Sequence, residues 1–274
     1  MEYHSAGANA GYAGQFALRV SGWRESPAAW LLGGVGRLAT DTSFMIQTPT
    51  YGDDRQLGYC AFCGGDTGTR DHCPSRVLLD EPYPENLPVV PACSPCNARF
   101  SLDEQYLACL ISCVFAGSTD PARIARPKIR RILSDSPALR ARIEQSRVES
   151  ADGVIFNPEH QPISTVITKL AQGHALYELH EPHPEPPDSI QIVPFGLMSD
   201  AECDAFESQH TDGISAWPEV GSRAMQHMVA IDTPPEYPWL VVQSGLYRFH
   251  ASVDSGISVR IVIHEYLTCH VHWD

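Results

Sequence analysis

The chain has 274 residues, of which 43% are hydrophobic and 19% are charged, and its formal net charge at pH 7 is −14. This length suits one large or two ordinary domains, and the apolar fraction is sufficient for a packed core, which excludes a disordered chain. The negative charge argues against a protein that coats nucleic acid nonspecifically. No membrane-spanning apolar run and no signal-peptide pattern occur in the sequence, so we expect a soluble, cytoplasmic protein without a membrane partner.

Composition and pattern divide the chain into four segments. Residues 1–56 begin with a stretch rich in Gly, Ala and Ser and are expected to form a flexible or loosely packed N-terminal segment. Residues 57–118 carry paired cysteines and are expected to form a metal-stapled module. Residues 119–180 are expected to be helical, and residues 181–274 to form an acidic, mainly antiparallel β domain. The predicted fold class is α+β.

Amphipathic patterns predict helices in the middle of the chain. Ser101 and Glu104 fit the S-x-x-E capping box, so the first helix is expected to begin there. Further helices are predicted over 124–133, 137–148 and 162–177. The stretch HEPHPEPPD at 180–188 has four prolines in nine residues, which predicts an extended connector.

The C-terminal residues are typical of a β-meander. Four short segments are rich in β-branched and aromatic residues, and Gly245 and the stretch Asp254-Ser255-Gly256 punctuate them: 239–243, 246–253, 257–264 and 266–273. An acidic domain of this kind is unlikely to bind DNA over a broad surface. We expect a regulatory, dimerisation or partner-binding role for it, and the sequence does not choose among these roles.

Two of the cysteine pairs have metal-ligand spacing. Cys60 and Cys63 form one C-x2-C pair, and Cys93 and Cys96 form a second one, with 29 residues between the two pairs. Two such pairs can complete a tetrahedral zinc site, whereas buried free thiols and a redox pair are the alternative interpretations. A site closed by four thiolates leaves no open position, so this zinc would be structural. The other five cysteines lack a partner at this spacing: Cys73, Cys109, Cys113, Cys203 and Cys269.

Residues between and beside these pairs resemble the HNH endonucleases, or ββα-metal nucleases, of the subgroup stapled by a four-cysteine zinc. The resemblance covers residues 59–104 and depends on four spaced elements: C-x2-C-G-G, D-H at 71–72, E-N-L at 85–87, and C-x2-C-N ending at residue 97. It implies a metal-dependent enzyme that hydrolyses phosphodiester bonds in DNA, in which a base deprotonates water and a divalent cation neutralises phosphate charge.

The resemblance also implies a role for individual residues. His72 would be the general base, and Asn86 would orient it. Asp71 and Asn97 would hold a catalytic Mg²⁺ or Mn²⁺ through oxygen atoms. The chain departs from the common pattern in having Asn97 where many members have His, and Phe100 where many have Lys. Phosphate contacts would then fall to neighbouring basic residues: Arg70, Arg76 and Arg99.

Charge is distributed unevenly along the chain. Residues 120–150 carry eight basic and four acidic groups, whereas residues 151–274 carry four basic and seventeen acidic groups. The basic segment could be a DNA-contacting arm or a solvated helix face. The rival to the nuclease interpretation is a catalytically inactive zinc-binding module that serves in protein or nucleic-acid binding.

Overall fold

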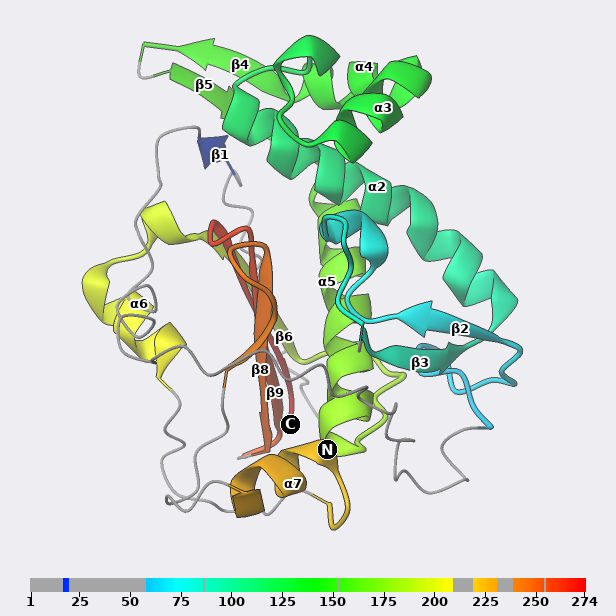
Figure 1. Ribbon diagram of the computed structural model, residues 1–274. Coiled ribbons are helices and arrows are strands. Elements are labelled where there is room, and N and C mark those ends of the chain that lie inside the picture. Colours follow the sequence, from blue (N-terminus) through cyan, green and yellow to red (C-terminus); the bar gives the residue numbers. More distant parts are fainter. Residues whose placement is uncertain are drawn as a thin grey trace, which may run out of the picture.

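The computed structural model describes residues 17–19, 58–85, 87–151, 153–208, 219–230, 239–253 and 255–274. Helices and antiparallel sheets alternate along these ranges, so the chain has a mixed fold with a five-stranded sheet near its C-terminus. Figure 1 shows α6 on one face of this sheet, α5 on the other, and α2 with the β2–β3 pair beyond α5. No helix within the described ranges is long and apolar enough to cross a membrane.

The cysteine-rich region folds as two strands followed by a helix. Strands β2 (Thr69–His72) and β3 (Val89–Ala92) pair antiparallel, with His72 opposite Val89. Helix α2 (Ser94–Ala116) starts one residue after β3 ends. The sheet and the helix are therefore joined at the second cysteine pair.

The predicted start of α2 at Ser101 was wrong. The helix begins at Ser94 because Cys93 is its N-cap and accepts a hydrogen bond from the Cys96 amide, with a proline in the first turn. The capping-box residues lie inside the helix. The side chain of Glu104 contacts the Ser75 hydroxyl instead.

Helix α5 (His160–His174) is the central element. It continues into a π-helical turn (Ala175–Leu179), packs against α2 on one side and contacts β9 and β10 on the other. The predicted helix over 162–177 is confirmed. The proline-rich connector that follows has no helix or strand, as expected.

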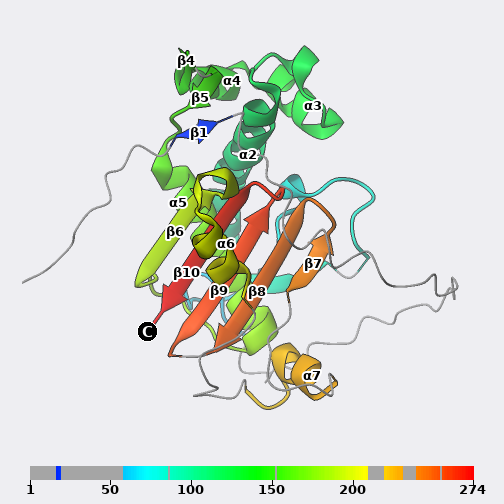
Figure 2. The ribbon, with the colours of Figure 1, turned by 90° about the vertical axis from the view of Figure 1, so that its left-hand side faces the viewer.

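The five-stranded sheet has the order β6-β10-β9-β8-β7, and its inter-strand pairings are antiparallel (Figure 2). Its strands are β6 (Ser189–Pro194), β7 (Leu240–Gln243), β8 (Tyr247–Val253), β9 (Ile257–Ile263) and β10 (Leu267–Trp273). The four strands predicted from the sequence agree with β7 to β10 to within a residue at each end. Strand β6 was not predicted, and it pairs with β10 at the edge of the sheet.

Smaller elements surround this frame. The predicted second and third helices correspond to α3 (Pro127–Asp135) and α4 (Pro137–Gln145). Helix α3 starts later than expected because Pro127 sets its N-terminus, whereas α4 starts at Pro137 as predicted and ends earlier than expected. Residue 148 belongs to a strand, not to the third helix. The remaining elements are β1 (Leu18–Arg19), β4 (Arg147–Ser150), β5 (Gly153–Phe156), α6 (Asp200–Glu207), α7 (Arg223–Ala230) and three 3-10 turns, Arg76–Leu78, Pro121–Arg123 and Phe195–Leu197.

Buried apolar side chains form one main cluster that extends from Leu18 to Trp273. All four segments distinguished in the sequence contribute residues to it. A smaller cluster surrounds the cysteine pairs and consists of Cys60, Ala61, Phe62, Val90, Ala92, Cys96, Phe100 and Leu176. Because Leu176 comes from the π-helical turn that continues α5, the cysteine-rich region packs directly against the end of the central helix.

Close contact between α5 and the residue after β2 depends on Gly173. A Cβ atom at Gly173 would lie 2.6 Å from the Cys73 sulfur and 3.2 Å from its Cβ atom. We expect Gly173→Ala to destabilise the protein by about 1–3 kcal/mol, because the helix or strand must shift to admit the methyl group. Gly68→Ala is the control, since a Cβ there meets nothing within 4 Å. Equal urea unfolding midpoints for the two variants would contradict this packing.

Two buried neutral histidines make stability sensitive to acid. Burial lowers the pKa of His174 to about 3 and that of His264 to about 4, with nearby cations adding to both shifts. Because an unfolded histidine takes up a proton below pH 6.5, each site costs about 2 kcal/mol of stability between pH 7 and pH 5. Burial raises the pKa of Glu178 to about 6, so its protonation in the folded state offsets about 1.4 kcal/mol of that loss.

We therefore expect the free energy of unfolding to fall by about 2 kcal/mol less in His264→Gln than in the wild-type protein between pH 7 and pH 5. Urea unfolding at pH 7 and pH 5 measures this difference, and the comparison cancels acid effects at other sites. Parallel pH dependences for the two proteins would show that His264 titrates normally in the folded state.

Candidate functional site

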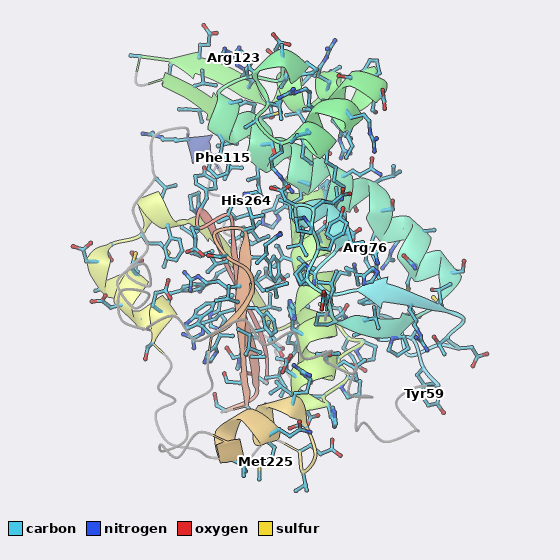
Figure 3. The ribbon with its side chains drawn as sticks, viewed as in Figure 1. Tyr59, Arg76, Phe115, Arg123, Met225 and His264 are labelled. Atoms are coloured by element: carbon cyan, nitrogen blue, oxygen red, sulfur yellow. The ribbon has the colours of Figure 1, made fainter. Side chains whose placement is uncertain are left out.

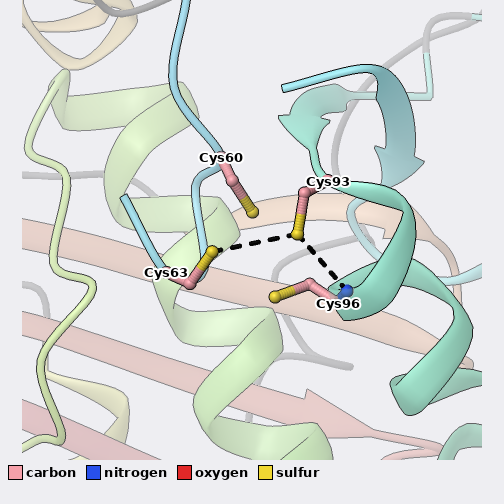
Figure 4. A group of neighbouring side chains, drawn as sticks. All are labelled: Cys60, Cys63, Cys93 and Cys96. Carbon is pink, nitrogen blue, oxygen red and sulfur yellow. Dashed lines mark hydrogen bonds between the residues drawn. The ribbon is translucent and has the colours of Figure 1, made fainter. Parts of the chain in front are cut away.

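Four cysteine sulfurs converge between the two C-x2-C segments, which we call the first knuckle (Cys60 and Cys63) and the second knuckle (Cys93 and Cys96). All four sulfur atoms lie within 4.8 Å of one another (Figure 4). The sulfurs of Cys63 and Cys93 are 3.8 Å apart. This cluster can hold a metal ion, and it is the one such group of three or more Cys, His, Asp or Glu side chains that we find within the described ranges.

Backbone hydrogen bonds shape the first knuckle. The amide of Cys60 donates to the Gly65 carbonyl at 2.7 Å, and the amide of Gly64 donates to the Cys60 carbonyl at 2.9 Å. Gly64 has a φ of 68°, which a residue with a side chain rarely adopts. The two glycines after the first cysteine pair thus allow the chain to fold back around the sulfurs.

The helix start activates one thiol of the second knuckle. The Cys96 amide donates to the Cys93 sulfur at 3.4 Å, and this hydrogen bond lowers the pKa of Cys93 to about 7. A metal is bound by the thiolate form, so the lowered pKa favours binding near neutral pH. Burial, in contrast, raises the pKa of Cys60, and a metal must displace its proton.

His72 ends strand β2 and is half-buried. Burial lowers the pKa of its imidazole, and the nearby charge of Arg76 lowers it further, while the negative charge of Asp71 and the Pro88 backbone oppose the shift. The neutral form of the ring therefore predominates at pH 7. A neutral imidazole is the form that can accept a proton from water.

Asp71 is held inside the molecule by a lysine. Its carboxylate oxygen lies 2.9 Å from the ammonium nitrogen of Lys169 in α5, whose side chain is fully buried. The same ammonium contacts Glu104 at 2.5 Å and donates to Ser75 at 2.9 Å. Burial raises the pKa of Asp71, and the lysine opposes this shift. Asp71, the residue before His72 on β2, thus belongs to a buried polar cluster.

Asn97 lies against β2 from the first turn of α2. Its side-chain amide donates to the Thr69 hydroxyl at 3.4 Å and to the Arg70 carbonyl at 3.3 Å. Both of these contacts with β2 use the amide nitrogen of Asn97 and do not involve its amide oxygen. Asn86 lies outside the described residues, so its predicted role has no structural counterpart here.

The three arginines predicted to contact phosphate lie around this strand and helix. Arg70 and His72 are two residues apart on β2 and project from the same side, since side chains alternate along a strand. Arg76 lies beside the loop after β2 (Figure 3) and above the Tyr83 ring at 5.6 Å. Arg99 lies over the Phe100 ring at 4.9 Å. No ion pair holds these three guanidinium groups within the described ranges.

The basic segment 120–150 is mostly occupied with internal contacts. Five of its eight basic residues pair with carboxylates or carbonyls within the fold: Arg126, Lys128, Arg130, Arg142 and Arg147. Arg123, Arg131 and Arg140 are exposed and have no such partner among the described residues. A solvated helix face therefore explains more of this segment than a DNA-contacting arm does.

The remaining cysteines pack in the interior, as expected of thiols without a matched partner. Cys73, Cys109, Cys113, Cys203 and Cys269 are all buried. Cys73 donates to the Leu170 carbonyl at 3.3 Å, and burial strongly raises its pKa. Cys73 thus serves the contact between β2 and α5.

Lys169 is the site residue that the sequence reasoning missed. It falls three residues after Val166 on the apolar side of the predicted helix, where a charge is out of place. A lysine on the buried stripe of a helix needs a carboxylate partner. The partners, Asp71 and Glu104, are far away in sequence, so the pattern along α5 alone does not identify them.

Comparisons with protein-family models, with curated proteins and with solved structures find no match to this chain. The functional assignment accordingly depends on the residues and geometry described above.

Proposed function

We propose that residues 59–104 form a zinc-stapled ββα-metal module of the HNH type and that the protein is a metal-dependent endonuclease acting on DNA. The observation that carries this proposal is a juxtaposition. The β2–β3 pair leads directly into α2, the four sulfurs meet at that junction, and His72 lies at the opposite end of the same strand pair, across from Val89. In this arrangement a rigid metal site fixes the strand that carries the base.

Zinc fits the four-sulfur cluster. Four sulfurs at about 2.3 Å from a tetrahedral zinc lie about 3.8 Å apart, which agrees with the 3.8 Å between Cys63 and Cys93. The ligand type also favours zinc, because thiolates are soft donors. Such a site would stabilise the fold and leave the chemistry to neighbouring residues.

His72 would act as the general base in the proposed mechanism. Its lowered pKa keeps the imidazole neutral, so its free nitrogen can take a proton from a water molecule that attacks the phosphorus atom. Asp71 and Asn97 offer a carboxylate and an amide oxygen, which suit Mg²⁺ or Mn²⁺. Such a cation, when bound, would neutralise charge on the scissile phosphate.

Phosphate binding would fall to Arg70 and Arg76, which flank His72. Neither guanidinium is engaged in an ion pair within the described ranges, and Arg76 is close enough to lower the pKa of His72. Two cations beside the base would hold the DNA backbone near the attacking water. Arg99, on α2, would extend this positive surface beyond Asn97.

The test is cleavage of supercoiled plasmid by the full-length, zinc-loaded protein. We expect nicked circles in the presence of Mg²⁺ or Mn²⁺ and none with EDTA added at a level that leaves the structural zinc in place. Zinc content measured after the reaction verifies that condition. Intact plasmid under both metals, with zinc retained, would contradict the proposal.

A catalytically inactive zinc-binding module is the second candidate. The observation that favours it is the engagement of the proposed cation ligands: Asp71 pairs with Lys169, and the Asn97 amide bonds to β2. A binding module predicts that the zinc-loaded protein retards DNA in a gel without cleaving it. Mn²⁺-dependent nicking would exclude this candidate.

A further inference from the structure

Three successive contacts hold β2 and the residue after it against α5. The Lys169 ammonium meets the Asp71 carboxylate at 2.9 Å, and the Leu170 carbonyl accepts from the Cys73 sulfur at 3.3 Å. One turn further along, Gly173 leaves room for the same sulfur. The helix therefore contacts both neighbours of His72 in the sequence.

The Lys169 ammonium is enclosed by groups from three parts of the cysteine-rich region. Asp71 and Glu104 supply carboxylates whose side chains are 11% and 13% exposed, and Ser75 supplies a hydroxyl. The ammonium also lies 5.7 Å from the Phe62 ring and 5.9 Å from the Phe100 ring. Phe62 lies between the two cysteines of the first knuckle, so one charge links the knuckle, β2 and α2.

The charges in this cluster do not cancel. Two carboxylates surround one ammonium, which leaves one excess negative charge. The ammonium lies 2.9 Å from the Asp71 carboxylate and 2.5 Å from the Glu104 carboxylate, and these two negative charges favour its charged form. Glu104 can thus retain the ammonium while the Asp71 carboxylate also faces a second cation.

We infer that Lys169 is a positioning residue, which fixes the carboxylate of Asp71, the residue before His72 on β2, from outside the ββα module. The inference rests on the proposed function and extends it to α5. A carboxylate that ligates a metal is itself fixed by a hydrogen-bonded partner, and loss of such a partner typically costs about 10–100-fold in metal affinity or activity. Lys169 belongs to α5, which also packs against the C-terminal sheet. This helix would therefore orient Asp71, the proposed ligand of the catalytic cation.

The first test variant removes the cation and one carboxylate together. Lys169→Met combined with Glu104→Gln keeps the net charge of the cluster, whereas Lys169→Met alone would leave two buried carboxylates without a cation. The control, Arg142→Met with Glu159→Gln, removes an ion pair of 2.6 Å that does not touch β2. Lys169→Gln and Lys169→Arg are measured in parallel, because arginine keeps a positive charge beside Asp71.

The measurements use the full-length, zinc-loaded protein: single-turnover plasmid cleavage, KM for DNA, and Mn²⁺ affinity by titration. We expect the double variant and Lys169→Gln to lose about 10–100-fold in kcat and in Mn²⁺ affinity with KM unchanged. Lys169→Arg should retain more of both, and the control pair should stay within about twofold of wild type.

Wild-type kcat and Mn²⁺ affinity in any folded variant that lacks the cation would overturn the inference, as would equal losses in Lys169→Arg and Lys169→Gln. Zinc content and the unfolding midpoint identify the folded variants. Absence of cleavage by the wild-type protein would instead contradict the proposed function. The Mn²⁺ titration still tests the contact between Lys169 and the cation ligand in that case.

Discussion

Cys96→Ser should release the zinc and unfold the region around β2, β3 and α2. Cys96 is 7% exposed, it lies in the smaller apolar cluster, and its amide caps the thiol of Cys93. Structural zinc sites contribute about 10–16 kcal/mol of apparent binding free energy in small domains, which exceeds what this small cluster can supply alone. Metal analysis should fall from about one zinc per chain to almost none, and the unfolding midpoint should drop sharply.

Cys203→Ser is the matched control for this experiment. Cys203 is also 7% exposed, but it packs in a separate apolar cluster under α6. The control should keep its zinc and lose only the modest stability expected when a buried sulfur becomes a hydroxyl. A Cys96→Ser protein that retained one zinc and a wild-type midpoint would show that the cluster is a group of free thiols.

His72→Ala should reduce DNA cleavage by about 10²–10⁴-fold, which is the usual contribution of a general base. Zinc content and the unfolding midpoint should change little, because the side chain is half-buried at the end of a strand and makes no ion pair within the described ranges. His272→Ala serves as the control, since His272 contacts Asp274 near the C-terminus. Cleavage should be unchanged in the control.

The pH dependence of cleavage should follow the protonation of the His72 imidazole. Because the base acts in its neutral form and its pKa lies below 6.5, the rate should stay level down to pH 6.5 and fall only at lower pH. Arg76→Gln removes one of the charges that lower this pKa. The fall in rate should then begin at a higher pH than in the wild-type protein.

Local patterns in the sequence predicted the C-terminal sheet and the central helix well. Gly245 and Gly256, both of which have positive φ, mark the turns before and after β8, whereas His264 and Glu265 take positive φ in the turn between β9 and β10. The cysteine spacing likewise predicted a four-sulfur cluster, because two knuckles of this type need only local backbone geometry. The helix and the turns of the sheet depend on residues close in sequence, whereas the cluster joins two cysteine pairs whose facing members, Cys63 and Cys93, are 30 residues apart and whose spacing alone identifies them.

Features that depend on distant contacts were not predicted. The capping-box pattern predicted a helix start at Ser101, but α2 is capped eight residues earlier by the sulfur of Cys93, which belongs to the cluster. The interior location of the Asp71 carboxylate is set by Lys169, almost a hundred residues away. The polar residues of the candidate site were predicted from local motifs, but the surroundings of Asp71 are set by packing against α5.

Chemical rescue tests the central claim, that His72 is the base of a metal-dependent nuclease. His72→Gly removes the imidazole and should leave the zinc-loaded protein almost inactive on plasmid with Mn²⁺. Added imidazole should restore cleavage in proportion to its neutral form, and it should have no effect on the wild-type protein. Full cleavage by His72→Gly without imidazole, or no rescue in a folded, zinc-containing variant of an active wild-type enzyme, would contradict the assignment.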